Sequence, residues 1–186
     1  MAATIIFEWD SRDLQVWRKR SVESALARAL AKSGGDAVRA MKAESSRQVR
    51  AKKKFKVALV NKSLPVTYPT SKEISRLAWR MDVSGALVPV AAFPHRQTRR
   101  GVSVAINVGA RKTIKSAFIA TMRSGHEGVF MRRGKKRLPI KEAFTTRVSD
   151  VFMNSGFIPL IQLKAQGVFA KAFERLLPVE LGRGKG

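Results

Sequence analysis

The chain has 186 residues, of which 45% are hydrophobic and none is cysteine. This composition excludes a disulfide framework and a thiolate metal site, and it argues against global disorder. Lys and Arg number 37 against 13 acidic residues, which gives a net charge of +24. Because so high a charge repels itself in a compact monomer, we expect an anionic partner, either nucleic acid or an acidic protein surface.

The N-terminal third is predicted to contain a strand and a long basic helix. Ala3–Trp9 has the β-branched and aromatic residues typical of a strand. Apolar residues recur at helical spacing over residues 21–59, and the Gly34-Gly35 pair is expected to kink or divide this helix. Residues 18–56 carry thirteen basic and three acidic residues. They are therefore predicted to form a basic helical arm with a cationic outer face.

Neither a secretory leader nor a membrane span is expected. The first residues carry acids where a signal peptide needs a basic region followed by a long apolar one. No stretch approaches the roughly 18 apolar residues of a membrane-spanning helix. We therefore expect a soluble protein with no membrane partner.

Residues 77–140 are predicted to form a β-meander core. The segment before it contains Pro65 and Pro69 and is expected to be an irregular connector. Period-two alternation predicts a strand at Leu77–Asp82 and another at Val102–Val108, the clearest in the chain. The remaining strands are expected at residues 87–93, 116–122 and 129–133, and basic loops or turns at 95–101, 110–115 and 134–137.

The C-terminal part is expected to be mainly helical. Residues after Leu138 are expected to begin extended and to become helical near Glu142. A last helix is predicted over residues 157–178, with Pro159 in its first turn and Pro178 ending it. Together the elements predict a single α+β domain over residues 1–186. In it, a small antiparallel sheet packs against long N-terminal and C-terminal helices.

Catalysis has little support in the sequence. His126 is followed by Glu127, but neighbouring side chains in a strand point to opposite faces. The other histidine, His95, lies in a basic segment, and two isolated histidines do not make a metal site. Residues 96–141 hold thirteen basic residues and one acid, so catalytic carboxylates cannot pair there. We expect no enzyme activity, metal or cofactor, with a cell-wall or nucleic-acid hydrolase using His126 as the alternative.

Charge supports nucleic-acid binding better than any motif does. The run Arg132–Arg137 lacks the glycine spacing and the Ser or Thr of a phosphate-binding loop. Phe118, Phe130, Phe169 and Phe173 fall at positions typical of a core, and not of a base-stacking platform. The candidate interface or DNA-facing residues are Arg50, Lys52, Lys53, Lys54, Arg99, Arg100, Arg111, Lys112, Arg132, Arg133, Lys135, Lys136 and Arg137.

An ordered set of short motifs runs from Arg99 to Glu142. A GVSV strand leads to the turn GARK, then to AFIATM-x-SGH-x-GVF-x-R, and last to GK-x-RLPI. In this order and spacing the segment resembles the tail completion (minor tail) protein Z family of tailed bacteriophages and prophages. The chain has Lys115-Ser116 where members often carry Pro-Gly. The part after Glu142 is similar only in its helical character.

The resemblance implies a structural virion protein that is made in the host cytoplasm and resides in the phage tail or neck. It implies action late in tail assembly at the head-proximal end, joining the tail to the head connector and helping to position DNA. The implied partners are further copies in a hexameric ring, the tail terminator, tail tube and head–tail connector proteins, and viral DNA bound non-specifically. A sequence-independent nucleic-acid-binding protein and a minor protein of the distal tail stay open as alternatives.

Overall fold

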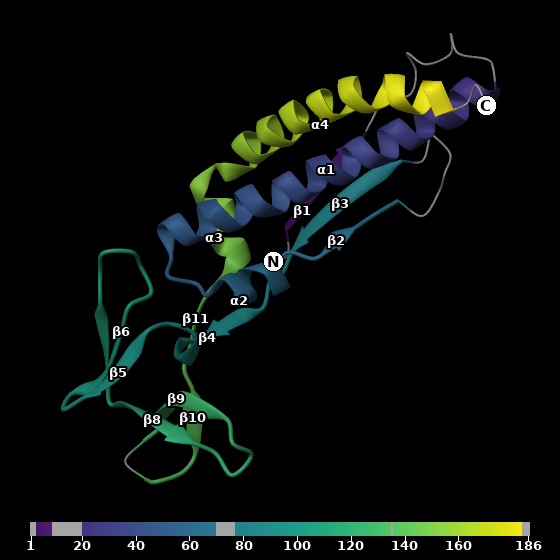
Figure 1. The fold of residues 1–186 in the computed structure, drawn as a ribbon. Helices are drawn as coiled ribbons and strands as arrows, with labels where there is room; N and C mark the ends of the chain where they lie inside the picture. Colours follow the sequence, from purple (N-terminus) through teal and green to yellow (C-terminus); the bar gives the residue numbers. More distant parts are fainter. Residues whose placement is uncertain (1–2, 9–19, 70–76, 135, 184–186) are drawn as a thin grey trace. The chain divides into compact units, whose positions relative to one another are not determined.

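A computed structural model describes residues 3–8, 20–69, 77–134 and 136–183 (Figure 1). It confirms the α+β class, because long helices near both ends of the chain accompany small antiparallel sheets. Contacts divide the chain into two compact units. The sheet unit comprises Ser46–Ser63 and Ser84–Ser155, and the helix unit comprises Ala2–Ser45, Leu64–Val83 and Gly156–Gly186.

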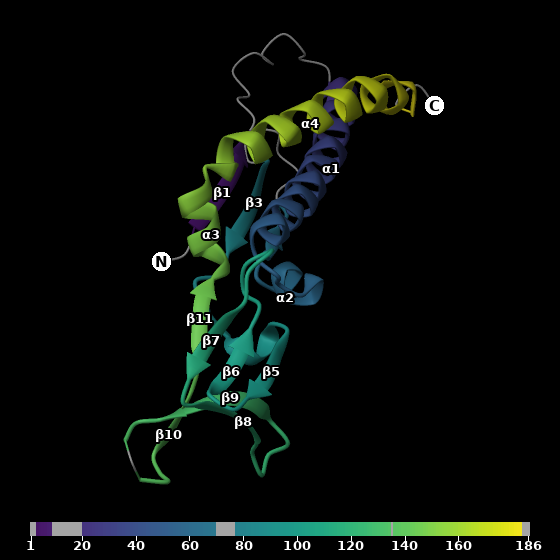
Figure 2. The ribbon, with the colours of Figure 1, turned by 90° about the vertical axis from the view of Figure 1, so that its left-hand side faces the viewer.

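The helix unit combines two long helices with a three-stranded sheet. α4 runs alongside α1 in both ribbon views (Figures 1 and 2). The sheet is antiparallel in the order β1-β3-β2, and its longest ladder pairs Ala3 with Val83 and Glu8 with Ala78. The elements are β1 (Ala3–Glu8), α1 (Arg20–Lys52, of which the part up to Ser45 belongs here), β2 (Val66–Thr67), β3 (Ala78–Val83) and α4 (Phe157–Gly182).

α1 continues through Gly34 and Gly35, so the predicted division of the helix at this pair is wrong. A Cβ atom on Gly34 would lie 2.2 Å from the indole ring of Trp79, which is fully buried on β3. Trp79 alternates with the exposed residues Ala78 and Arg80, as the period-two pattern predicted. The glycine therefore makes room for an aromatic side chain. Burial of that ring outweighs the helix-propensity cost of about 1 kcal/mol.

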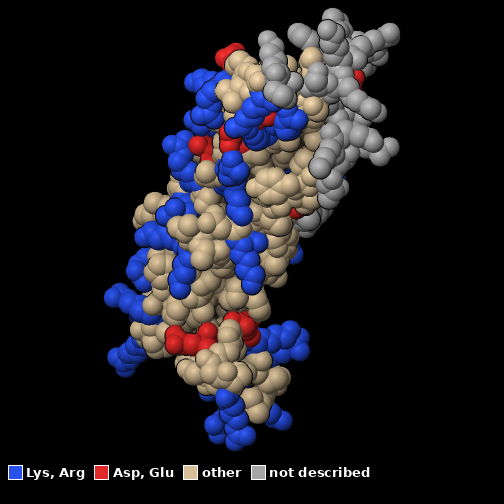
Figure 3. Space-filling model, turned by 45° about the vertical axis from the view of Figure 1, so that its right-hand side comes forward, with Lys and Arg blue, Asp and Glu red and all other residues tan. Residues whose placement is uncertain are grey.

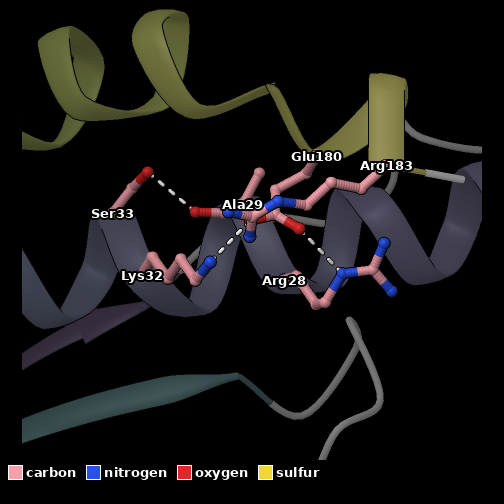
Figure 4. A network of polar contacts seen from close by, with 6 residues as sticks. All are labelled: Arg28, Ala29, Lys32, Ser33, Glu180 and Arg183. Atoms are coloured by element: carbon pink, nitrogen blue, oxygen red, sulfur yellow. Dashed lines mark hydrogen bonds and ion pairs between the residues drawn. The ribbon is translucent and has the colours of Figure 1, made fainter. Parts of the chain in front are cut away.

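α4 extends past Pro178 to Gly182, so the prediction that Pro178 ends the helix is wrong. Two residues further on, the side chain of Glu180 is only 1% exposed. Its carboxylate accepts hydrogen bonds from Lys32 Nζ at 2.5 Å, from Arg28 Nε at 2.8 Å and from Arg183 Nη1 at 3.1 Å (Figure 4). The bonds from Lys32 and Arg28 hold the pKa of Glu180 at about 2. These contacts join the last turns of α4 to α1, which offsets the backbone hydrogen bond that proline lacks.

The sheet unit contains three small antiparallel sheets, so the predicted single meander is divided. β5, β6 and β7 form one sheet, β8, β9 and β10 form a second, and β4 pairs with β11. Two short helices and a 3-10 turn complete the unit. The elements are α2 (Val57–Lys62), β4 (Leu87–Pro89), η3 (Val90–Ala92), β5 (His95–Thr98), β6 (Gly101–Val104), β7 (Lys112–Lys115), β8 (Ala117–Thr121), β9 (Glu127–Arg132), β10 (Ile140–Glu142), β11 (Phe144–Arg147) and α3 (Val148–Ser155).

Two segments predicted as basic loops or turns are strands. β5 and β7 flank β6 as the edges of their sheet, and most of their side chains are exposed. Charged side chains are typical of edge strands because they discourage pairing with other chains. The predicted strand over Val102–Val108 ends at Val104, since Ile106 O accepts a hydrogen bond from Lys54 N at 2.8 Å.

The predicted strand at residues 87–93 is also shorter than expected. It ends at Pro89 and continues as the turn η3, where Val90 N donates to Ala143 O at 2.9 Å. The two three-stranded sheets are linked by Gln97 of β5. Its side-chain oxygen accepts from Ile119 N at 3.0 Å, and its nitrogen donates to Ala117 O at 3.5 Å. Both hydrogen bonds reach β8, so this one side chain fixes the second sheet against the first.

Candidate functional site

The described candidate interface residues all belong to the sheet unit. Lys135 lies outside the described residues. On the face drawn in Figure 3, Lys and Arg side chains are widely distributed, and acidic side chains form only small groups among them. Within the sheet unit, backbone pairing brings the predicted cationic residues together in two clusters.

The first cluster lies at the end of α1, and we call it the helix-end cluster. α1 ends at Lys52, so the predicted helix over residues 53–56 is not formed. Instead Lys53 forms a β-bridge with Asn107, and its Nζ donates to the Asn107 side chain at 2.6 Å. Val108 N donates to Lys52 O at 3.3 Å. The cluster consists of Lys52, Lys53 and Lys54 with Arg111 and Lys112, which follow the same turn, and exposed Arg50 lies in the last turn of α1.

The position of these cations reduces the cost of their mutual repulsion. Lysines and arginines at the C-terminal end of a helix interact favourably with its dipole. Arg111 is fixed on the other side, where its Nε donates to Ser103 Oγ on β6 at 3.3 Å. Lys52, Lys54 and Lys112 keep exposed side chains. The cluster therefore presents several cations to solvent from a backbone that is held in place.

The second cluster lies at the opposite end of β6, and we call it the turn cluster. Arg99 and Arg100 form the β5–β6 turn, and Arg100 O accepts from Ser116 N at 3.2 Å. Ala117 pairs with Met131 in the next sheet, which brings Arg132 of β9 to the same edge. The cluster consists of Arg99, Arg100, Lys115 and Arg132 with Arg133, Lys136 and Arg137, which extend into the exposed β9–β10 connection.

The register of β6 separates the two clusters. Gly101 pairs with Lys115 at one end of the strand, and Val104 pairs with Lys112 at the other. Three residues of a strand span about 10 Å. The described candidate residues therefore form two groups at opposite ends of β6, and not a single pocket. Such an arrangement suits contacts at successive points along an extended polyanion.

Arg132 also contacts an aromatic ring. Its guanidinium carbon lies 5.2 Å from the centre of the Phe118 ring, and Phe118 lies 6.3 Å from Phe130. Phe130 and Phe169 are buried as predicted, while Phe118 and Phe173 are half-buried. Because a cation already covers Phe118, this ring is not a free platform for stacking a base.

A polar cavity of about 510 Å³ lies beside the helix-end cluster. Asp150 accepts a hydrogen bond from Arg147 N at 3.1 Å, and Thr146 Oγ1 donates to Arg147 O at 3.3 Å. Both of these polar side chains therefore already form hydrogen bonds within the protein. With two cations and one carboxylate among its walls, the cavity does not have the uniform charge of a phosphate site. The lining residues are Lys52, Lys53, Asn107, Thr146, Asp150, Val151 and Asn154.

His126 and Glu127 face different partners, as their adjacency predicted. His126 Nε2 lies 3.0 Å from Glu142 Oε1 on β10, and Glu127 Oε1 lies 3.9 Å from His95 Nε2. The ring of His95 also contacts Phe93 O through Nδ1 at 2.8 Å. The sequence reasoning missed Glu142, because only the pairing of β10 with β9 brings it to the β8–β9 turn. Within the described residues, no three His, Asp or Glu side chains gather closely enough to hold a metal ion.

No family model, curated protein or solved structure matches the chain. None of the helices in the described ranges combines the length and apolar character required to cross a bilayer. The case for function therefore depends on the geometry of the sheet unit and on the motifs of residues 99–142.

Proposed function

We propose that the chain is a structural virion protein of a tailed phage that acts as a tail completion or minor tail protein. It would act at the head-proximal end of the tail, where it joins the tail to the head connector and helps to position DNA. The observation that carries this proposal is the ordered motif run from Arg99 to Glu142. Its pieces coincide with structural elements, since GVSV is β6, AFIAT is β8, GVF-x-R lies in β9 and RLPI leads into β10.

The departure at Ser116 also fits the family pattern. Ser116 has a φ of 59°, in the left-handed region that glycine adopts most easily. Members of the tail completion protein Z family, which the segment resembles, often carry a glycine at this position. The resemblance and the local backbone therefore agree on the turn between β7 and β8.

The two cationic clusters support a contact with anionic partners. Their cations project from turns and edge strands of a folded unit, where DNA or an acidic connector protein can reach them. A non-enzymatic role is consistent with histidines that pair singly with carboxylates. In the assembled particle, a ring of such chains would be stabilised by neutralisation of its charge.

The location of the protein in the particle tests this proposal. We would place an epitope tag after Gly186 in the phage that encodes the chain, and image gold-labelled antibodies on purified particles. We expect label at the neck, one site per particle. A tag on the tail tube protein, which should label the whole tail, is the matched control.

The other locations correspond to the alternatives. Label at the distal tip would show a minor protein of the distal tail and overturn the joining role. Particles without the protein, from cells that produce it, would favour the sequence-independent nucleic-acid-binding protein. The exposed cations of the sheet unit are the observation that favours nucleic-acid binding as the second candidate function.

A further inference from the structure

The outer face of α4 carries large apolar side chains that the helix unit leaves uncovered. Leu160 is 49% exposed and Leu163 is 71% exposed, whereas Ile161, Ala165 and Phe169 of the same helix are buried. In Figures 1 and 2, α1 lies along one side of α4, and no other described helix of this unit lies along the opposite side. α4 is therefore apolar on two opposite faces, although a helix packed on one side needs only one.

The exposed apolar residues have the spacing of a helix-pairing seam. Leu160, Leu163, Gly167 and Ala170 follow one another at intervals of three, four and three residues, and all four are exposed. These intervals correspond to the a and d positions of a heptad repeat. Glu174 occupies the next a position and marks the end of the apolar band. The seam covers nearly two heptads, from the first turn of α4 to its middle.

Gly167 supports a partner on this face. A glycine within a helix costs about 1 kcal/mol relative to alanine, so its presence calls for a packing reason. Gly34 has such a reason inside the chain, because its missing Cβ makes room for Trp79. A Cβ on Gly167 would meet nothing within 4 Å. The space beside Gly167 is open to a side chain from outside the unit.

The charges beside the seam indicate the character of the partner. Lys164 and Lys171 are exposed and both occupy e positions, next to the d residues Leu163 and Ala170. In an antiparallel pair of identical helices, e positions face each other, so a second copy would oppose lysine with lysine. A helix with acidic residues at the matching positions would instead form ion pairs across the seam.

We propose that the outer face of α4 binds an acidic amphipathic helix of a different protein. Leu160 and Leu163 insert between the apolar residues of that helix, Gly167 receives one of its larger side chains, and Lys164 and Lys171 pair with its carboxylates. This inference goes beyond the proposed function and does not depend on it, since it uses only the helix unit.

A designed peptide tests the apolar part of the proposal. The probe is a fluorescent 21-residue helix with leucine at a and d and glutamate at e and g, titrated with the full chain in a fluorescence anisotropy assay. Leu163→Ser should weaken binding at least about tenfold. Met153→Ser, which changes an exposed apolar residue of α3, should leave it unchanged. A scrambled peptide of the same composition, without the apolar stripe, should bind the unaltered chain at least about tenfold more weakly.

A charge exchange tests the polar part. Lys164→Glu with Lys171→Glu should weaken binding of the peptide, and a peptide with lysine in place of glutamate should bind this double variant more tightly than it binds the unaltered chain. Circular dichroism melting would check that each variant keeps its fold. If the scrambled peptide bound as tightly as the designed one, or if the Leu163→Ser chain bound the peptide as tightly as the unaltered chain, binding would depend on net charge alone. Either result would overturn the proposal. A dimer of the unaltered chain in light scattering that Leu163→Ser abolishes would also overturn it, because the occupant would then be a second copy.

Discussion

Glu180 shows how one residue can make stability depend on pH. Its pKa lies at about 2 in the folded chain against an ordinary value of 4.5, chiefly because Lys32 and Arg28 donate hydrogen bonds to it. A lowered pKa contributes stability that is fully present above about pH 4.5 and is lost as the pH falls towards 2. The carboxylate thus favours folding wherever it is ionised.

We predict that Glu180→Gln lowers the melting temperature by a few degrees at pH 7. The neutral amide leaves Arg28 and Lys32 without their carboxylate partner. Unlike the carboxyl group of Glu180, the amide does not titrate. The difference in melting temperature between the original chain and the variant should shrink as the pH falls from 4.5 to 2. Thermal melts at several pH values check this, with Glu174→Gln, an exposed site on the same helix, as the control. A constant difference over that range would contradict the assigned pKa.

Single residues also mark where the sequence alone is informative. Trp79 and Met81 were predicted to lie on one face of a strand, and both are buried, because period two follows directly from strand geometry. Gly34 was expected to kink or divide the helix, because the aromatic ring that explains this glycine lies 45 positions further along the chain. Glu142 was missed beside His126 for the same reason. Contacts that join distant segments leave no local signal in one sequence.

At the scale of elements, β5 and β7 were missed because their composition is that of loops. Their residues are HRQT and KTIK, with few apolar positions. An edge strand gains its order from backbone pairing with β6 and needs little burial of its own. The alternating pattern identified β6, which is central in its sheet, but not its edges. The candidate residues were found by charge, whereas their division into two clusters required the strand register.

The turn between β5 and β6 yields a prediction for DNA binding. Arg99→Gln with Arg100→Gln should reduce the slope of log K against log salt by about 2 for a plain duplex, since each lost phosphate contact removes about 0.9. Arg80→Gln with Lys171→Gln removes the same charge from exposed sites of the helix unit and should change the slope little. Fluorescence anisotropy titrations over a range of NaCl concentrations would measure both. Equal changes in the two variants would mean that DNA does not favour the turn cluster.

At the scale of the whole molecule, the net charge of +24 governs self-association. Repulsion between exposed charges extends over about 30 Å at 0.01 M salt but only about 8 Å at 0.15 M. A ring of identical basic chains should therefore form more readily as salt increases. This dependence is opposite in sign to that expected for binding to DNA.

We predict that the purified chain is monomeric at low salt and assembles into a closed ring at physiological salt or above. Six chains of 20.6 kDa would give a ring of about 124 kDa. Sedimentation velocity across a salt series checks this, with a globular protein of small net charge as the control. A monomer at every salt concentration would contradict self-assembly of the chain into a ring.

The arrangement into two units could not be read from the sequence, which predicted one domain. The units alternate along the chain, and one change of unit falls inside α1, between Ser45 and Ser46. A boundary within a continuous helix has neither the proline nor the glycine of a linker. Composition and periodicity identify elements well, but they do not indicate how interleaved segments are grouped.

This interleaving has a consequence for the order of events during translation. The segments of the sheet unit are all synthesised once Ser155 has been added. The helix unit still lacks α4 at that moment, and its ion pair between Arg28 and Glu180 spans 152 positions. Its first helix must therefore leave the ribosome long before the partner helix exists, and Arg28 and Lys32 lack their carboxylate partner until Glu180 has been added. The nascent chain therefore passes through a stage in which every segment of the sheet unit is present while the helix unit still lacks its last helix.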